Sequence, residues 1–219
     1  MFEATILTDE AALSKNQFAS LLPYVSSKKR ARVERFRFFR DARNTLLGDL
    51  LARHEICRFT GRCNSDLQFS ANEYGKPIVT NCPGLHYSIS HTGFLVACVI
   101  ADKPVGIDIE LVKPVDMNIA RRFFVADELS YVLDTDSTRR FFEVWTKKES
   151  RIKWEGKGLA KPLTSFSVFD TAASEAINYS GVLCTEDTQS HVCSAIKEEL
   201  IINVLSVAEL LDRLFTGDF

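Results

Sequence analysis

The order of its helix-like and strand-like segments constrains the fold of this chain more than any other feature. Segments with a helical apolar period come first, and shorter alternating or continuously apolar segments bounded by turn residues follow. This order occurs once before residue 103 and again after residue 112. The predicted helices cover residues 14–22, 26–59, 117–133, 137–155 and 207–215, and the predicted strands cover residues 1–10, 85–90, 94–101, 105–111, 165–170, 176–184, 190–197 and 200–206.

The repeated order predicts an α+β fold with two similar halves. A faint echo in the sequence agrees with this, because RFFRDAR at 37–43 and RFFVADE at 122–128 stand at corresponding places. The halves should meet near residues 103–112. We therefore expect an N-terminal half at residues 1–104 and a C-terminal half at residues 105–219.

Composition and charge argue against several classes of protein. The 219 residues are 46% hydrophobic and 26% charged, which suits a soluble globular chain. With a net charge of -2, the chain lacks the overall positive charge that is typical of nucleic-acid-binding proteins. The apolar run 94–101 is far shorter than the roughly 20 residues that cross a bilayer. The acidic start does not look like a signal peptide, and the six cysteines form no CxxC pair. We expect a cytoplasmic protein without disulfides, zinc, membrane or nucleic-acid partners.

Two acids stand two residues apart in the strand-like segment VGIDIE, residues 105–110. On a strand, Asp108 and Glu110 project from the same face. At ~4 Å their charges repel by roughly 4 kcal/mol at an effective dielectric near 20, so water, a shared proton or a cation must relieve them. Mg²⁺ takes oxygen ligands of this kind, often together with substrate phosphates. A solvated strand end with two ordinary acids is the alternative, although Gly106 permits a close approach to the strand.

The segment FFEVWTKKESRIKWEGKG, residues 141–158, forms the second candidate group. Glu149 lies at the edge of its apolar helical face, with Lys153 one turn further along. These two could be a solvated i,i+4 ion pair, which contributes only about 0.2–0.5 kcal/mol. Lys148 falls within the apolar face, so we expect an anionic group against this helix. The apolar face consists of Phe141, Phe142, Val144, Trp145 and Ile152.

Three further stretches could contact phosphate. YSISHTG at 87–93 places His91 before a glycine turn, where it could donate to phosphate or transfer a proton near neutral pH. The segment 26–43 holds eight Lys or Arg against two acids, and NEYGKP at 72–77 contributes Lys76. No P-loop, GxGxxG or GxSxG motif is present. A metal site, several cations and one histidine together indicate phosphoryl chemistry on a substrate with several phosphates.

In this order, these stretches resemble the 4′-phosphopantetheinyl transferases, specifically the surfactin-synthetase-activating (Sfp-type) group. That family has a GKP turn, a SISH-type turn, a G(I/V)D(I/V)E strand and a WxxKExxxK helix. They stand here at residues 75–77, 88–91, 106–110 and 145–153. The resemblance covers roughly residues 20–170, and the last 50 residues carry little of it.

The resemblance implies a holo-[acyl-carrier-protein] synthase that transfers the 4′-phosphopantetheine arm of coenzyme A. The acceptor is a serine of an apo acyl or peptidyl carrier protein, and 3′,5′-adenosine bisphosphate is released. By matching positions, Asp108, Glu110 and Glu149 would hold Mg²⁺, or Mn²⁺ in its place. Glu149 would also deprotonate the carrier serine, directly or through water. Lys153 and His91 would contact the pyrophosphate, and these two with Glu149 form the implied catalytic set.

The resemblance also implies a set of coenzyme A contacts. Lys29, Arg32 and Thr45 would lie near the 3′-phosphate, and Lys76 and Ser90 would line the adenosine-phosphate pocket. The family's fold is a monomer of two pseudo-equivalent α+β halves related by pseudo-twofold symmetry, with the active site in the cleft between them. The basic helix and the SISH turn would come from the first half, and the acids from the second.

Two other functions stay open at this point. The chain could be a different Mg²⁺-dependent phosphoryl-transfer enzyme, or a module that binds coenzyme A or a carrier without catalysis. The intact set of Asp108, Glu110, Glu149 and Lys153 argues against the binding module. The sequence assigns no role to Glu128 or to Lys147 and does not identify the carrier. The segment RFFVADELSYVL at residues 122–133 could contact a carrier helix or pack in the core, and nothing in the sequence decides between the two.

Overall fold

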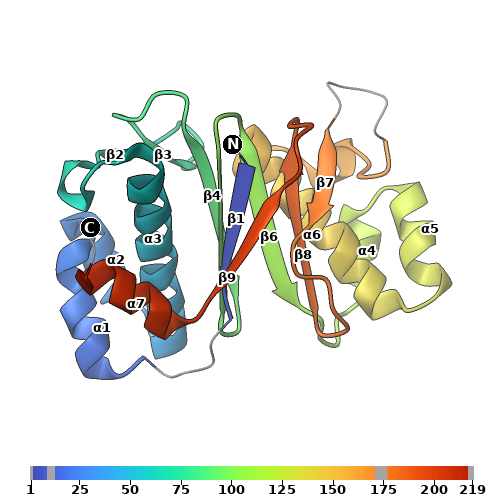
Figure 1. Cartoon of the computed structure of the whole chain (residues 1–219). Helices are drawn as coiled ribbons and strands as arrows, with labels where there is room; N and C mark the ends of the chain where they lie inside the picture. Colours follow the sequence, from blue (N-terminus) through green and yellow to red (C-terminus); the bar gives the residue numbers. More distant parts are fainter. Residues whose placement is uncertain (1, 9–12, 171–176, 217–219) are drawn as a thin grey trace.

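Two β-sheets stand face to face in the middle of the molecule, and helices cover the outer face of each (Figure 1). The structure is a computed structural model that describes residues 2–8, 13–170 and 177–216. This architecture confirms the predicted α+β fold of two halves. The apolar core between the sheets consists of Phe2, Ala4, Ile6, Ala97, Val99, Ala101, Val105, Ile107, Ile109, Val192 and Ile196.

The first half contains a four-stranded sheet, a small hairpin and a layer of helices. Its elements are β1 (Phe2–Leu7), α1 (Lys15–Leu21), α2 (Ser27–Val33), α3 (Phe39–Thr60), β2 (Phe69–Ala71), β3 (Pro77–Val79), β4 (His86–Thr92) and β5 (Leu95–Ala101), completed by β9 (Ile201–Leu205) and α7 (Val207–Thr216). The sheet order is β4-β5-β1-β9. β1 runs antiparallel to β5, with Thr5 opposite Cys98, and parallel to β9, with Glu3 opposite Ile201.

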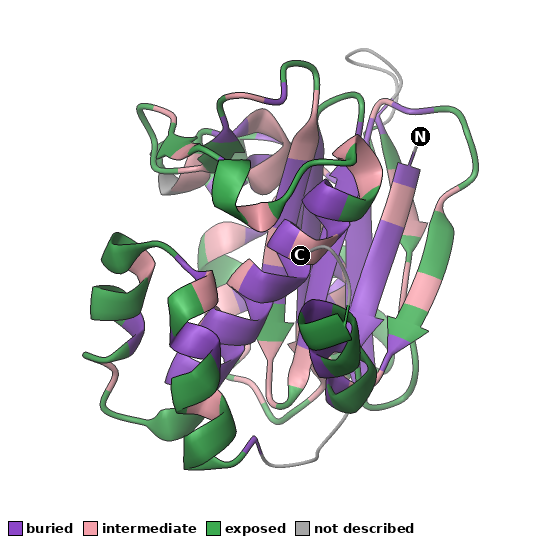
Figure 2. Cartoon of the chain, turned by 60° about the vertical axis from the view of Figure 1, so that its left-hand side comes forward, coloured by how far each residue is buried: buried purple, intermediate pink, exposed green. Residues whose placement is uncertain are grey.

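β5 reads as a continuous apolar run because both of its faces are buried, as expected of a strand between two layers. Ala97, Val99 and Ala101 face the second sheet, whereas the alternate side chains Val96, Cys98 and Ile100 face the helices. Figure 2 shows the buried residues along the sheet and along the inner face of α3, with exposed residues on the outer turns. The apolar stripe predicted for α3 is buried there and consists of Leu46, Leu47, Leu50, Leu51 and Ile56.

The second half is built around a three-stranded antiparallel sheet in the order β6-β8-β7. Its elements are β6 (Val105–Leu111), α4 (Asn118–Phe123), α5 (Ala126–Asp134), α6 (Ser137–Glu155), β7 (Asn178–Gly181) and β8 (Thr188–Ser194). α6 packs on β6, and a Cβ placed on Gly106 would lie 2.0 Å from the backbone oxygen of Ser150. The expected close approach at Gly106 is therefore confirmed, and the element that approaches is α6.

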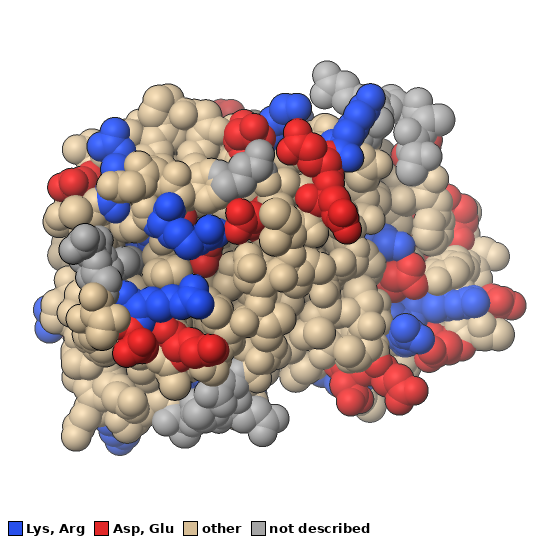
Figure 3. Space-filling view, viewed as in Figure 1, with Lys and Arg blue, Asp and Glu red and all other residues tan. Residues whose placement is uncertain are grey.

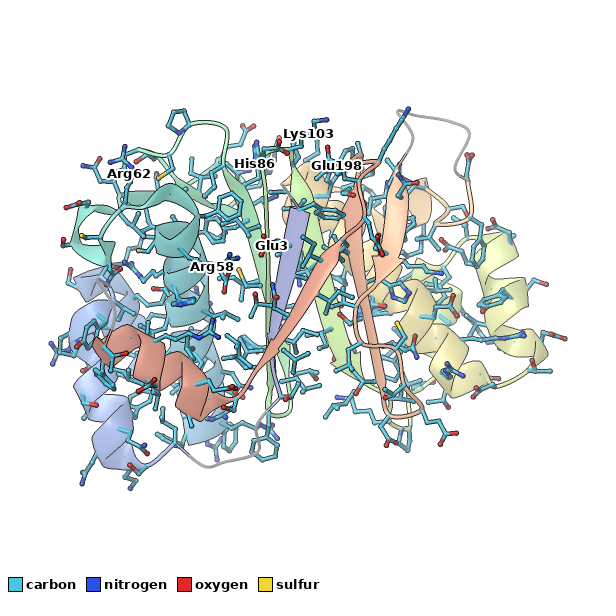
Figure 4. The ribbon with its side chains drawn as sticks, viewed as in Figure 1. Glu3, Arg58, Arg62, His86, Lys103 and Glu198 are labelled. Carbon is cyan, nitrogen blue, oxygen red and sulfur yellow. The ribbon has the colours of Figure 1, made fainter. Side chains whose placement is uncertain are left out.

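The last part of the chain returns to the first half, where β9 adds the edge strand next to β1 and α7 joins the helical layer (Figure 1). Polar contacts reinforce this junction. Arg58 of α3 and Glu3 of β1 point toward one another (Figure 4), with 2.5 Å between guanidinium nitrogen and carboxylate oxygen. Asn203 of β9 donates to the same carboxylate at 3.3 Å. β1, α3 and β9, which are far apart in the sequence, therefore meet at Glu3.

Two stretches that were each predicted as one helix form two helices. Residues 26–59 form α2 and α3 rather than one helix, because α2 ends at Val33 and Phe38 has an extended backbone. Residues 117–133 form α4 and α5, because Phe124 and Val125 are both extended. In each case the chain changes direction in a short non-helical connection, after which α3 packs on its sheet and α5 packs on α6.

The strand predicted at residues 165–170 is wrong, since a 3₁₀ turn at Leu163–Ser165 leads into an irregular segment. Buried side chains take over the backbone hydrogen bonds that a sheet would have made. Lys148 Nζ donates to the carbonyls of Leu163 and Phe166, and Val168 N donates to the carboxylate of Glu128. The ends of two other predicted strands, at residues 1, 9–10 and 176, lie outside the described residues.

Candidate active site

The strand that carries the paired acids lies beside β4, although β4 and β6 belong to different sheets. Alternate residues of β4 carry hydroxyls on one face, and these side chains reach across to β6. Ser88 Oγ accepts a hydrogen bond from Ile107 N at 3.3 Å, and Ser90 Oγ accepts one from Ile109 N at 3.4 Å. Thr92 Oγ1 donates a hydrogen bond to Glu110 Oε2 at 3.2 Å. We call this contact between His86–Thr92 and Val105–Leu111 the β4–β6 seam. It joins the two halves through side chains.

Asp108 lies at the centre of the β4–β6 seam and is only 4% exposed. Its Oδ1 accepts hydrogen bonds from Ser90 Oγ at 2.9 Å and from Lys153 Nζ at 2.7 Å. Its Oδ2 is also buried and has no hydrogen-bond partner among the described residues. A buried carboxylate oxygen without a partner is costly. The second oxygen of Asp108 is therefore suited to binding a cation.

The pKa values of Glu110 and Glu149 are affected by burial and by the negative charge of Asp108. Burial, followed by the charge of Asp108, raises the pKa of Glu149 to about 7, and Lys153 opposes this rise. Burial and the same Asp108 charge also raise the pKa of Glu110, against the hydrogen bond from Thr92. The three predicted metal ligands, which come from β6 and α6, are thus electrostatically coupled.

The donor set fits a magnesium ion that is bound together with a phosphate-containing substrate. Within the described part of the chain, no group of three His, Cys, Asp or Glu side chains could hold a metal ion by itself. Mg²⁺ nevertheless usually takes only one or two protein carboxylates and completes its shell with waters and substrate phosphates. Asp108, with its unpartnered buried oxygen, and the coupled Glu110 and Glu149 supply oxygens of the required kind.

Lys153 contacts Asp108, and His91 of β4 lies near enough to Lys153 to be affected by its charge. Besides Asp108, Lys153 Nζ donates to Ser90 Oγ at 3.1 Å and to the carbonyl of Ile107 at 2.9 Å. Desolvation by surrounding protein atoms, followed by the charge of Lys153, lowers the pKa of His91, although its side chain is exposed. His91 is therefore mostly neutral near pH 7, and a neutral imidazole still donates one hydrogen bond.

A pocket of about 250 Å³ opens between the two halves. The predicted coenzyme A residues Lys76 and Lys153 both line it, together with Pro77, Tyr87 and Ile89. Lys76 Nζ donates to the carbonyl of Val105 at 3.0 Å, and burial lowers the pKa of Lys76 to about 8. The GKP turn therefore lies in the cleft with the end of α6.

The cations of the basic segment, residues 26–43, differ in whether they lie near the site or pair elsewhere. Arg32 lines an open groove on α2, and its charge is near enough to lower the pKa of His91. Lys29 is instead paired with Asp49, with 3.0 Å between Nζ and the carboxylate. Thr45 lies half-buried on α3. The structure thus brings Arg32 toward the histidine and gives Lys29 a partner within the protein.

Charges are mixed on the face seen in Figure 3, where Lys and Arg alternate with Asp and Glu around a broad uncharged centre. The coloured residues of that face form no large patch of one sign. Among the described residues, no helix combines the length and the apolar character that crossing a membrane requires.

The predicted anionic group against α6 is Glu128, whose role the sequence did not reveal. Both Glu128 and Lys148 are fully buried, with 2.8 Å between carboxylate oxygen and ammonium nitrogen. Lys147 pairs with Glu143 one turn before it, at 2.6 Å. Neither lysine reaches the β4–β6 seam in the structure. A lysine on an apolar helical face was the signal for the buried pair, but no local pattern identified its partner. Thr92 lies within YSISHTG, but the motif itself indicates no role for it.

Two family models match the chain. The model described as 4′-phosphopantetheinyl transferase, N-terminal, matches residues 12–104, and the 4′-phosphopantetheinyl transferase superfamily model matches residues 104–205.

Several relatives match at high identity. The chain is 45% identical over 159 residues to 4′-phosphopantetheinyl transferase Sfp of Bacillus subtilis (strain 168), covering 71% of each chain. It is 44% identical over 157 residues to 4′-phosphopantetheinyl transferase psf-1 of Bacillus pumilus, covering 70% of this chain and 67% of that one. Identity to 4′-phosphopantetheinyl transferase gsp of Aneurinibacillus migulanus is 36% over 169 residues, covering 76% and 70%. With this similarity across both halves, the chain belongs to the 4′-phosphopantetheinyl transferase family, in its Sfp-type group.

Proposed function

We propose that the protein transfers the 4′-phosphopantetheine arm of coenzyme A to a serine of an apo acyl or peptidyl carrier protein and releases 3′,5′-adenosine bisphosphate. The observation that carries this proposal is the β4–β6 seam. There, acids of the second half meet Lys153, while His91 and a row of hydroxyls come from the first half. Such a group of cations and donors can stabilise the charge that develops on a pyrophosphate during displacement.

In the proposed reaction, the serine oxygen attacks the phosphorus that carries the pantetheine arm. A new P–O bond forms, and the bond to the adenosine bisphosphate breaks. Asp108, Glu110 and Glu149 would hold Mg²⁺, or Mn²⁺ in its place, which supplies positive charge to the pyrophosphate oxygens. Lys153 has three donors, all engaged within the protein. To contact the pyrophosphate, it exchanges one of these bonds.

Glu149 is suited to receive the proton of the carrier serine, directly or through a water molecule. A carboxylate accepts a proton only in its ionised form, and a cation next to Glu149 favours that form against the burial and the Asp108 charge, which raise the pKa of Glu149 to about 7 in the metal-free protein. His91 donates an N–H to the pyrophosphate as a neutral imidazole.

Coenzyme A would lie across both halves in the proposed complex. Lys29, Arg32 and Thr45 would bind its 3′-phosphate, and Lys76 would bind the adenosine-phosphate part in the 250 Å³ pocket. Lys29 would have to share its charge between this phosphate and Asp49.

We further propose a cytoplasmic monomer. Its two segments, residues 1–104 and 105–219, each contribute groups to the one cleft. The first supplies Lys76 and the hydroxyls of β4, and the second supplies the acids and Lys153, while β9 and α7 of the second segment complete the sheet and the helical layer of the first. The carrier protein would approach the same cleft with its serine.

The test is a transfer assay. The purified protein is mixed with coenzyme A, Mg²⁺ and a panel of apo carrier proteins, and mass spectrometry reads the added arm. Asp108→Ala should abolish transfer, because it removes the buried oxygens at the centre of the seam, while circular dichroism shows an intact fold. Glu186→Ala, which removes an exposed acid, is the matched control and should keep full activity.

Full activity of Asp108→Ala would refute the assignment. Release of free phosphate without any carrier would favour a different phosphoryl-transfer enzyme. Binding of coenzyme A without transfer to any carrier would favour a binding module.

A further inference from the structure

Two hydroxyls of β4 contact the two acids of β6 one to one. Ser90 Oγ donates to Asp108 Oδ1 at 2.9 Å, and Thr92 Oγ1 donates to Glu110 Oε2 at 3.2 Å. We propose that Ser90 and Thr92 are positioning residues, which hold Asp108 and Glu110 in the orientation that binds the metal ion. This inference rests on the proposed function and deepens it.

The hydrogen bonds of Ser90 leave its hydroxyl no capacity for a substrate. A serine hydroxyl has one donor and two acceptor positions. Ser90 Oγ donates to Asp108 and accepts from Lys153 Nζ at 3.1 Å and from Ile109 N at 3.4 Å. All three positions are filled by protein groups. We therefore assign Ser90 to the support of Asp108, in place of the coenzyme A contact expected from the family resemblance.

The bond from Ser90 also determines which oxygen of Asp108 stays available. Oδ1 is engaged by Ser90 and by Lys153, whereas Oδ2 is buried and unpartnered among the described residues. With one oxygen fixed by two donors, the carboxylate cannot turn freely about its last torsion. The unpartnered oxygen is thereby presented in one direction.

Thr92 plays the equivalent part for Glu110. The Glu110 side chain is longer and only half-buried, so without a partner it has several rotamers to choose from. The hydroxyl of Thr92 fixes one of its oxygens. One residue lies between Ser90 and Thr92, as one lies between Asp108 and Glu110, so hydroxyls and acids have the same spacing along the two strands of the seam.

Side chains must hold β4 and β6 in register, because the two strands belong to different sheets. β4 pairs with β5, and β6 pairs with β8. Side-chain contacts across the β4–β6 seam therefore set the position of the acids relative to the first half. Residues that orient metal ligands in this way typically affect metal affinity by 10–100-fold when they are mutated.

The experiment measures metal binding directly. Mn²⁺ is titrated into the purified full-length protein, alone and with coenzyme A but no carrier, and free Mn²⁺ is read by electron paramagnetic resonance. Thr92→Val keeps the shape and the strand preference of threonine and removes the hydroxyl. It should weaken Mn²⁺ binding about 10-fold or more. Thr92→Ser restores the hydroxyl and should bind nearly as the wild type does. Ser90→Ala should weaken binding at least as much as Thr92→Val.

The controls separate positioning from general damage. Thr80→Val removes an exposed hydroxyl outside the seam and should change nothing. In the transfer assay, Thr92→Val should raise the Mg²⁺ concentration needed for half-maximal rate and leave the KM for coenzyme A unchanged at saturating Mg²⁺. Wild-type Mn²⁺ affinity in Thr92→Val, or a loss confined to the KM for coenzyme A, would overturn the inference. A wild-type protein that binds Mn²⁺ under neither condition would overturn it as well.

The two proposals can fail independently. If no carrier is modified but Thr92→Val still weakens Mn²⁺ binding, the positioning role stands and the transferase activity falls. If carriers are modified and Mn²⁺ affinity is the same in Thr92→Val, the transferase stands and the positioning role falls.

Discussion

Adding one methyl group at Gly106 should separate the two elements that carry the acids and Lys153. A Cβ at this position would lie 2.0 Å from the backbone oxygen of Ser150, 2.4 Å from the backbone nitrogen of Trp154 and 2.9 Å from the carbonyl carbon of Lys153. Ordinary contact begins at 3.4 Å, so the backbone of α6 would have to retreat from β6 by about 1.4 Å. All three atoms belong to the helix backbone, so no side-chain rotation can relieve the clash.

This displacement sets the expected magnitudes. Overpacking a core by one methylene group costs about 1–3 kcal/mol, occasionally more. Because backbone atoms receive the clash, we expect Gly106→Ala to lower the free energy of unfolding by about 3 kcal/mol. Lys153 would also move away from Asp108, where the ammonium nitrogen now lies 2.7 Å from the carboxylate. Misplacement by about 1 Å can cost roughly 100-fold in rate, so a similar loss of transfer is expected.

Urea denaturation followed by circular dichroism measures the stability, and the transfer assay measures the rate under conditions where the variant is folded. Gly48→Ala is the matched control. There the nearest atom is a methyl carbon of Ile89 at 2.9 Å, which can move, and alanine is favoured in a helix interior by about 0.5–1 kcal/mol. We expect Gly48→Ala to stay within about 1 kcal/mol of the wild type and to keep its activity. Wild-type stability and rate in Gly106→Ala would show that this contact between helix and strand is not required.

Substitutions at three other places test separate parts of the structure. Glu128→Gln or Lys148→Met leaves a buried charge without its partner, and each should lower the free energy of unfolding by about 3–5 kcal/mol. The double substitution should recover much of this loss. Strictly additive losses in urea denaturation would contradict the pairing. Burial lowers the pKa of His191 from 6.5 to about 4, so the unfolded chain takes up this proton first as the pH falls. The stability contributed by neutral His191 is therefore complete above about pH 6.5 and should fall by about 2 kcal/mol between pH 7 and pH 5. His191→Gln should make the free energy of unfolding change less between pH 7 and pH 5, and an unchanged dependence on pH would refute this role of His191. Lys29→Ala should raise the KM for coenzyme A more than the KM for dephospho-coenzyme A, and equal increases would argue against a contact with the 3′-phosphate.

The elements of the fold were predictable where one local period controls burial. The apolar stripe of α3, the apolar face of α6 and the continuous run of β5 all lie where the sequence placed them. The prediction failed at residues 165–170, where an apolar segment looks like a strand. Its backbone partners are the side chains of Lys148 and Glu128, which come from distant positions in the chain. Local patterns carry no information about partners of this kind.

The site could be predicted in part for a similar reason. The spacing of Asp108 and Glu110 and the helical edge with Lys153 are local patterns, and the structure brings these groups together. The contacts of Ser90 and Thr92 depend on how two separate sheets pack, and no pattern within either strand determines that packing. Charge pairing is equally non-local, so the sequence could not show that Asp49 engages Lys29.

The parallel pairing of β9 with β1 has a consequence for how the chain folds during synthesis. β1 leaves the ribosome before the second half is made, but β9, its neighbour on one side, follows only after the second half. Until then β1 has an unpaired edge, which can pair with other chains. Contacts between residues so far apart in the sequence also slow folding. The first half therefore cannot complete its sheet independently as it emerges, and its last strand and helix can dock only after the second half has been synthesised.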